Sequence, residues 1–419
     1  MSLAFLDPLS QLLLQLVTVL VASRITGSLF ARLGQSAVIG EMAAGVLLGP
    51  SLLGWVAPGV FQTIFPASSL GTLQLLSQIG VCLFLFVVGM TMDVGHLRQK
   101  APAAVVISYA SIVVPAVLGA LVSLLLFTSL AGSRATTTSF TLFMAISMSI
   151  TAFPVLARIL DERNLSRTPL GTMALTSAAV GDVTAWVLLA GIVALTQDAG
   201  WTGSILTLLW VVAFAAVMLF GVRRWLPHWM ESGAQPEEAF GHNVLVGALA
   251  LMLVSALTTE LIGIHALFGA FLAGVVMPSQ ASLRQHVIVR IEDFSAVFLL
   301  PLFFVFTGLR TSLTLINDLA GWGICLAIIL VATAGKLGGT YIAARSTGIP
   351  RPDAFALGAL MNTRGLMELI ALNIGYDLGI LSPRIFAMLV IMALVTTALT
   401  GPLLTWSNRW RVTARDEAG

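Results

Sequence analysis

Long apolar runs separated by short polar stretches dominate the 419-residue chain. Because a membrane-spanning helix needs roughly 20 apolar residues, these runs predict about thirteen transmembrane helices. Aromatic residues lie within continuous apolar runs, which favours helices over the alternating strands of a membrane barrel. The predicted spans cover residues 9–30, 37–53, 70–92, 103–127, 137–160, 169–196, 203–222, 244–259, 265–277, 294–309, 322–345, 353–374 and 382–406.

The composition also indicates a membrane protein. Hydrophobic residues make up 58% of it and charged residues only 10%, whereas soluble domains contain about 25% charged residues. We therefore predict an all-α, polytopic integral membrane protein. Cys82 and Cys325 lie in apolar runs and are expected to be small buried side chains, without a disulfide or a metal pattern. The first run lacks the basic region and cleavage site of a signal peptide.

Basic residues are distributed unequally between the predicted loops. With the N-terminus outside, about fifteen of the 21 Lys and Arg residues fall on the cytoplasmic side. That set comprises Arg32, Arg98, Lys100, Arg158, Arg163, Arg167, Arg223, Arg224, Arg284, Arg290, Arg345, Arg351, Arg409, Arg411 and Arg415. The outer side holds only Arg134, Arg310 and Arg384. This bias predicts an outside N-terminus, a cytoplasmic C-terminus and an odd number of spans. We expect the protein to lie in a bacterial-type inner membrane.

Two predicted spans are interrupted at corresponding places. In the fifth, Pro154 removes a backbone donor and disfavours helical geometry at Phe153. In the twelfth, Asn362, Thr363 and Gly365 bring polar and flexible residues to mid-span. The spacing suits inverted repeats of helices one to six and eight to thirteen, joined by helix seven. Paired breaks of this kind indicate the binding site of a transporter. We expect one domain over residues 1–419, without a soluble regulatory domain.

The stretch SAAVGDVTAW places Asp182 near the middle of its span. A charge at that depth costs roughly 2.5–3.5 kcal/mol on insertion scales. A carboxyl group there is either a protonated or hydrogen-bonded structural residue, or an ion and proton site. We favour the second interpretation, which is the default for an intramembrane carboxylate.

Lys336 lies about nine residues before Arg345, roughly 13 Å from the predicted cytoplasmic end of its helix. That depth is too great for its side chain to reach the interface comfortably. Asp182 is its simplest partner, either as a permanent structural ion pair or as part of a functional site. Nearby Gly335, Gly338 and Gly339 are small enough for another helix to approach closely.

Other polar groups fall at or beside the two breaks. Thr151 and Pro154 in the fifth span, and Asn362 and Thr363 in the twelfth, could supply hydroxyls and freed carbonyls to a cation. A packing kink at Pro154 is the alternative. Arg364 and Glu368 are four residues apart on one helix face, so they are expected to satisfy each other. A role in balancing the dipoles of the broken helices stays open for that pair.

Six stretches of the sequence carry a further signal: SITAFPVLARIL, SAAVGDVTAWVLLA, IGIHALFGAFLAGVVMP, FLLPLFFVFTGLRT, AGKLGGT and MNTRGLMELIALNIG. They resemble the monovalent cation:proton antiporter-2 family, with particular likeness to plant cation/proton exchangers and their bacterial relatives. The resemblance covers nearly the whole chain in order. It implies thirteen helices, a homodimer, two crossing broken helices as in the sodium/proton antiporter fold, and a mobile core of helices four to six and eleven to thirteen.

By the same resemblance, Asp182 corresponds to the cation- and proton-binding aspartate and Lys336 to the basic residue of helix eleven. Thr151 then lies at the helix-five crossover. The chain also departs from the family pattern. Gly181 stands where sodium-selective relatives keep Asn or Asp, and Thr151–Ala152 stands where many relatives place an acid. We expect no counterpart of the nucleotide-binding domain that gated potassium efflux relatives carry.

The predicted function is secondary active exchange of a monovalent cation, K⁺ or Na⁺, for protons that compete for Asp182. One or two protons per cation are possible, depending on whether Lys336 titrates. The sequence contains no phosphate-binding loop, zinc-ligand cluster or nucleophile–base arrangement, so we expect no enzyme, no cofactor and no nucleic-acid partner. A sodium-coupled solute symporter, a cation channel and a non-transporting sensor are the alternatives.

Overall fold

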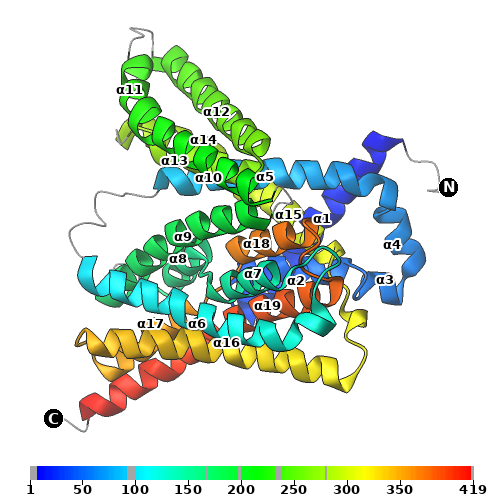
Figure 1. Ribbon diagram of the computed structural model, residues 1–419, viewed down its shortest axis with the longest axis vertical. Helices are drawn as coiled ribbons and strands as arrows, with labels where there is room; N and C mark the ends of the chain where they lie inside the picture. Colours follow the sequence, from blue (N-terminus) through cyan, green and yellow to red (C-terminus); the bar gives the residue numbers. More distant parts are fainter. Residues whose placement is uncertain are drawn as a thin grey trace. The chain divides into compact units, whose positions relative to one another are not determined.

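The computed structural model describes residues 7–91, 101–166, 168–196, 200–231, 237–278 and 281–416, and this part of the chain is almost entirely helical (Figure 1). The predicted all-α class is therefore confirmed. The longer helices are α1 (Pro8–Arg32), α2 (Ala37–Leu48), α5 (Leu70–Thr91), α6 (Ala101–Leu130), α7 (Thr137–Ser149), α9 (Pro169–Thr196), α10 (Gly200–Ala216), α12 (Glu237–Ile262), α14 (Ala281–Phe294), α16 (Leu319–Ser346) and α19 (Pro383–Asp416). The shorter ones are α3 (Leu53–Val56), α4 (Pro58–Ile64), α8 (Phe153–Glu162), α11 (Arg223–Glu231), α13 (Ala266–Val276), α15 (Leu300–Leu309), α17 (Arg351–Met361) and α18 (Leu366–Asp377).

The helices belong to two compact units, and both predicted breaks lie in the larger one. That unit comprises Met1–Ala67, Gly95–Leu189 and Phe304–Gly419. Within it α6 packs against α7 and α16, and α19 packs against α17 and α18. The second unit comprises Ser68–Val94 and Ala190–Phe303. Its centre is formed by α13, which packs against α5 and α12.

The number of membrane spans differs from the predicted thirteen. Among the described residues, ten helices are long and apolar enough to cross a membrane, or eleven if the bent pair α17–α18 forms one span. The predicted span 265–277 corresponds to the short helix α13. The span 294–309 is part of a longer helical stretch that begins at Ala281 with charged residues and continues through a π-helical turn at Ser295–Leu299. The predicted third span ends at residue 92, which lies outside the described residues. The same is true of three of the basic residues, Arg98, Lys100 and Arg167.

Helix α1 reverses the arrangement found in soluble proteins. Its exposed face carries Leu13, Val17, Val21 and Ile25, and its buried face carries polar side chains such as Gln15. The Gln15 side chain donates a hydrogen bond of 2.8 Å to the carbonyl of Ile64. An apolar outer face suits a lipid environment, in which polar groups must be satisfied inside the protein. The chain is an integral membrane protein.

Glycines set the close helix contacts of the larger unit. A Cβ added to Gly335 or Gly339 of α16 would lie within 3.1 Å of α6 atoms, so both glycines allow α16 and α6 to approach closely. The prediction is confirmed for these two positions. It is wrong for Gly338, because a Cβ added there would meet no atom of another helix within 4 Å in the described part of the chain.

Candidate functional site

The first break separates α7 from α8. Helix α7 ends at Ser149, Ile150 and Ala152 have extended backbone angles, and α8 begins at Phe153. The predicted effect on Phe153 is therefore wrong, because this residue is already helical. Pro154 occupies the first turn of α8, where a missing backbone N–H removes no intrahelical hydrogen bond.

The second break separates α17 from α18, whose axes differ by 41°. Helix α17 ends at Met361, and Gly365 precedes the first residue of α18. Gly365 has a φ of 154°, and a Cβ there would lie 2.8 Å from Val155 Cγ2 of α8. Glycine is needed at this position both for its backbone angle and for the close approach of α8.

The two breaks cross each other. The backbone N–H of Ala152 donates a hydrogen bond of 3.1 Å to the carbonyl of Thr363, and the Thr151 hydroxyl donates one of 3.1 Å to the carbonyl of Met361. The interruptions, more than 200 residues apart in sequence, thus hold each other's freed backbone groups. Irregular backbone inside a membrane protein is tolerated when such partners exist.

Lys336 lies at the first break. Its completely buried ammonium donates hydrogen bonds to the Ser149 carbonyl, to the Thr151 hydroxyl at 2.5 Å and to the Ser111 hydroxyl at 3.4 Å. Ser149 is the last residue of α7, so the charge stands at the negative end of that helix dipole. The ammonium is therefore held by three neutral oxygens from α6, α7 and the break.

Asp182 is also completely buried, and neither carboxylate oxygen has a hydrogen-bond partner among the described residues. The carboxyl interacts electrostatically with the backbone N–H of Phe153, without reaching hydrogen-bond geometry, and with the Lys336 ammonium. Phe153 opens α8, whose N-terminal end favours a negative charge. A buried carboxylate without hydrogen bonds is costly unless another group neutralises it.

Asp182 and Lys336, the predicted charge partners, interact electrostatically but do not form a salt bridge in the described structure. The two groups interact only over a longer distance, because the ammonium of Lys336 is turned toward the end of α7. The freed backbone carbonyl and the Thr151 hydroxyl compete successfully for this cation. Asp182 is thereby left open to another positive charge.

Arg364 and Glu368 do pair as predicted, with 3.2 Å between Arg364 Nη1 and Glu368 Oε2. Both side chains are completely buried. The guanidinium also donates hydrogen bonds to the carbonyls of Ser147 at 2.7 Å and Met148 at 2.8 Å, in the last turn of α7. Arg364 thus places a cation at the C-terminal end of a half-helix, an arrangement compatible with the dipole-balancing role, which stays a prediction.

Asn362 and Thr363 lie at the crossing with neutral partners. Asn362 Nδ2 is 3.4 Å from the Thr396 carbonyl, and its Oδ1 has no partner within the described ranges. The Thr363 hydroxyl is 3.3 Å from that of Thr400. The Thr397 hydroxyl accepts a bond of 2.9 Å from the Arg364 N–H and donates one of 3.0 Å to the Arg364 carbonyl. Helix α19 thus holds the second break.

Sequence reasoning missed the hydroxyl and carbonyl groups around these charges. Ser111, Ser149 and Thr397 each bind a charged residue of the crossing or its backbone. The available signal was the presence of small hydroxyl residues at helical spacing in apolar spans. That signal is weak, because such hydroxyls commonly bond to their own helix.

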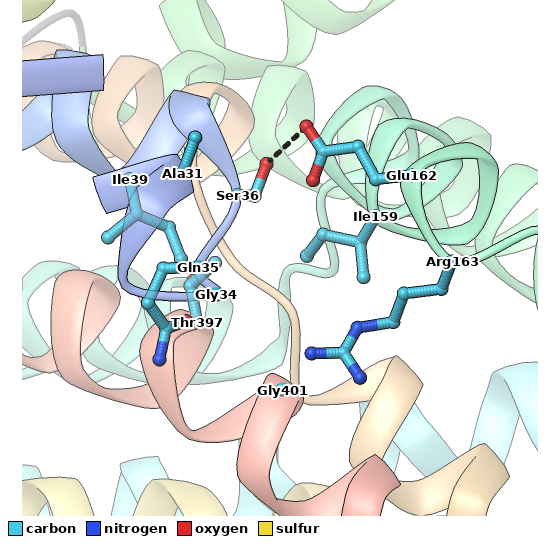
Figure 2. A pocket seen from close by; sticks show the side chains of 10 residues that line it. All are labelled: Ala31, Gly34, Gln35, Ser36, Ile39, Ile159, Glu162, Arg163, Thr397 and Gly401. Atoms are coloured by element: carbon cyan, nitrogen blue, oxygen red, sulfur yellow. Dashed lines mark hydrogen bonds between the residues drawn. The ribbon is translucent and has the colours of Figure 1, made fainter. Parts of the chain in front are cut away.

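A cavity of about 390 Å³ lies beside the crossing, where α8 ends (Figure 2). Its lining includes Ser36, Glu162 and Arg163, together with Thr397 and Gly401 of α19. Ser36 donates a hydrogen bond of 3.3 Å to Glu162, which joins the α1–α2 turn to α8. Because Thr397 bonds the backbone of Arg364, the cavity adjoins the second break.

No group of three or more His, Cys, Asp or Glu side chains within the described ranges could hold a resident metal ion. Cys82 and Cys325 are free and buried, as predicted. The site therefore consists of four buried charges of opposing sign, hydroxyls and freed backbone groups. This donor set suits a proton or a single monovalent cation.

Comparison with known proteins gives matches over nearly the whole chain. Residues 16–410 match the family described as sodium/hydrogen exchanger, transmembrane. The Na⁺/H⁺ antiporter NhaS4 of Synechocystis is 41% identical over 94% of this chain and 96% of its own length. Cation/H⁺ antiporter 17 of Arabidopsis thaliana is 40% identical, and K⁺/H⁺ antiporter 1 of Saccharomyces cerevisiae is 33% identical. The chain spans about half of these last two relatives, 48% and 46% of their lengths.

The fold also matches a solved structure, that of the sodium proton antiporter MjNhaP1 from Methanocaldococcus jannaschii. The TM-score is 0.67, with 95% of this chain and 97% of that chain covered. Sequence identity is only 15%, so this likeness concerns the fold. It confirms the predicted fold type.

Proposed function

Because the chain belongs to the transmembrane sodium/hydrogen exchanger family, we propose that it is a secondary transporter that exchanges K⁺ or Na⁺ for protons. The observation that carries the proposal is Asp182, a buried carboxylate without a hydrogen-bond partner in the described part of the chain, beside two crossing broken helices. The names of the relatives support the same cations.

Coupling follows from competition at one carboxylate. A proton and a monovalent cation each add one positive charge to Asp182, so the two loaded states carry the same total charge. The empty site keeps a bare carboxylate, which is costly to move through a low-dielectric barrier. Only loaded carriers therefore change sides, and each transit of a cation is matched by a return with a proton.

The surroundings of Lys336 support an exchange of one proton per cation. Its ammonium is held by the oxygens of Ser149, Thr151 and Ser111 rather than by Asp182. A cation that binds Asp182 consequently leaves the partners of Lys336 in place, and the lysine keeps its proton. The cycle is then electroneutral and independent of membrane voltage.

The proposal includes an architecture. A mobile core would comprise α6–α9 and α16–α19, which contain both breaks, and the other helices would form the scaffold of a homodimer. The two halves of the chain would be inverted repeats, with the N-terminus outside and the C-terminus in the cytoplasm of a bacterial-type cell. The cavity at the end of α8 would be the route by which ions reach the crossing from the cytoplasm.

The test is cation-dependent proton movement in proteoliposomes that contain a pH-sensitive dye. Addition of NaCl, KCl or LiCl to one side should release protons from the other, without any organic solute. An electroneutral cycle predicts the same rate when a potential of either sign is imposed. An electrogenic cycle would instead gain about 2.3 kcal/mol per transported charge from 100 mV. Solute-dependent uptake or single-channel currents would contradict the proposal.

Asp182→Asn should abolish this exchange while the protein still folds, because an amide cannot bind a proton and a cation alternately. Asp318→Asn is the matched control, since Asp318 is half exposed and pairs with Arg384. Its exchange rate should equal that of the unchanged protein. Retained cation-dependent proton movement in Asp182→Asn would contradict the assignment of the site.

A further inference from the structure

The position next to Asp182 is Gly181 of α9, and it faces α6 across a small gap. A Cβ at Gly181 would lie 3.5 Å from Ser108 Oγ and 4.0 Å from Ile112 Cδ1, which are ordinary van der Waals distances. A Cβ at Gly335, by contrast, would lie 3.1 Å from the Pro115 Cα. Gly181 is therefore not required for close helix packing, and it leaves room for one small group between α9 and α6.

One buried hydroxyl borders this gap, and a second lies one helical turn away on α9. Ser108 is completely buried, its oxygen faces the Gly181 position, and it has no hydrogen-bond partner in the described part of the chain. Ser177 precedes Gly181 by four residues and therefore lies on the same face of α9. It is also completely buried, and no described residue bonds its hydroxyl.

Neighbouring hydroxyls in the same helices behave differently. Thr176 and Thr184 of α9 donate to the carbonyls of their own helix four residues earlier, at 2.8 Å each. Ser123 of α6 donates to Ala120 and to Thr141. Intrahelical bonds of this kind are the usual arrangement for serine and threonine. Ser108 and Ser177 do not form such an intrahelical hydrogen bond, although leaving a buried hydroxyl unpaired costs free energy.

We infer that the hydroxyl oxygens of Ser108 and Ser177 are ligands of the monovalent cation bound by Asp182, and that the ion or its last water occupies the gap at Gly181. This inference rests on the proposed exchange function and assigns the residues that distinguish one cation from another.

The chemistry of the gap fits an alkali cation. Such an ion loses its hydration shell on entering the protein and needs neutral oxygens in its place. Asp182 supplies the single negative charge, and hydroxyls add oxygen ligands without changing the net charge of the site. A proton bound to Asp182 needs no such ligands. The hydroxyls therefore act on the cation half of the cycle and not on the proton half.

The experiment measures the apparent KM for NaCl, KCl and LiCl in proteoliposomes at fixed pH. Ser108→Ala and Ser177→Ala should each raise the KM of the best cation about tenfold, the loss expected for one ligand oxygen. The turnover at saturating cation should change less than about twofold, because the proton half of the cycle is unaffected. Gly181→Ala should raise the KM for the largest exchanged cation more than for the smallest.

Conservative variants and a control separate a ligand role from a structural one. Ser108→Thr and Ser177→Thr keep the hydroxyl and should restore the KM to within about threefold of its original value. Ser123→Ala removes an equally buried hydroxyl of α6 that already has partners, and it should leave every KM unchanged. The melting temperature of each variant shows whether the fold is intact.

Unchanged KM values in Ser108→Ala and Ser177→Ala would overturn the ligand assignment while leaving the proposed function in place. The ligand assignment would also be overturned if the turnover fell equally for all three cations and the threonine variants did not restore it. Absence of any cation-dependent proton movement in the unchanged protein would instead contradict the proposed function, and this inference with it.

Discussion

The two breaks at the crossing are held by different kinds of groups. The carbonyls freed at the end of α7 accept hydrogen bonds from two cations, Lys336 and Arg364. Those freed at the end of α17 accept them from the neutral hydroxyls of Thr151 and Thr400. A C-terminal helix end attracts cations in general, so the difference does not follow from helix dipoles alone.

The difference indicates that the two breaks contribute differently to stability and to exchange. Lys336, one of the two cations at the first break, interacts electrostatically with Asp182. The second break is held by uncharged hydroxyls, and one more of them, Thr397, bonds the backbone of Arg364. We therefore expect substitutions at the first break to affect both stability and exchange, and those at the second to affect mainly stability.

Arg364→Met should have the largest effect on folding. It leaves Glu368 as an unpaired buried charge and frees the carbonyls of Ser147 and Met148. Removal of one partner of a buried pair typically costs about 3–5 kcal/mol of unfolding free energy. A thiol-reactive dye can follow thermal unfolding, because Cys82 and Cys325 are both buried. The double variant Arg364→Met/Glu368→Met should regain part of the loss, and no recovery would contradict this explanation.

Lys336→Met should cause the second-largest loss of unfolding free energy. The carbonyl of Ser149 and the hydroxyl of Thr151 lose a charged donor, which corresponds to about 1.5–3 kcal/mol. Exchange should also slow, because the positive charge that attracts the empty Asp182 carboxylate is gone. Proteoliposome rates and thermal unfolding measure the two effects. Lys336→Arg keeps the charge, and it should retain more activity than Lys336→Met.

Thr397→Val should have the smallest effect of the three. It removes an acceptor for the Arg364 N–H and a donor to the Arg364 carbonyl, without changing any charge. The expected loss is about 1–2 kcal/mol of unfolding free energy, with the KM for cations unchanged. Thr397→Ser keeps the hydroxyl and should be close to the original stability. A large change in KM with unchanged stability would remove the distinction between the two breaks.

The fold could be predicted to a useful degree from the pattern of apolar runs. Pro154 and the polar residues around Gly365 marked both breaks, because each disturbs helical hydrogen bonding in a way that residue identity reveals. The count of thirteen spans was less secure. The charged start of α14 continues without interruption into apolar α15, and α13 is shorter than a span.

The sequence predicted which charged residues would lie inside the apolar spans, but not their contacts. Asp182, Lys336, Arg364 and Glu368 stood out as charges in apolar runs, and the pair Arg364–Glu368 followed from its spacing. The partners of Lys336 could not be predicted, because they include a backbone carbonyl 187 residues earlier in the chain. A carbonyl is present at every residue, so only the three-dimensional position of the end of α7 distinguishes this one.

The linker before α7 and the linker after α18 are also joined by backbone hydrogen bonds. An antiparallel bridge joins Ala131 to Leu381, and the N–H of Gly132 donates a bond of 2.8 Å to the Ile380 carbonyl. Together with the Ala152–Thr363 bond at the crossing, these bonds connect the chain at both ends of α7 and α18. Separating the two half-helices would break backbone hydrogen bonds at both ends, so we expect α7 and α18 to move together if the core moves as proposed.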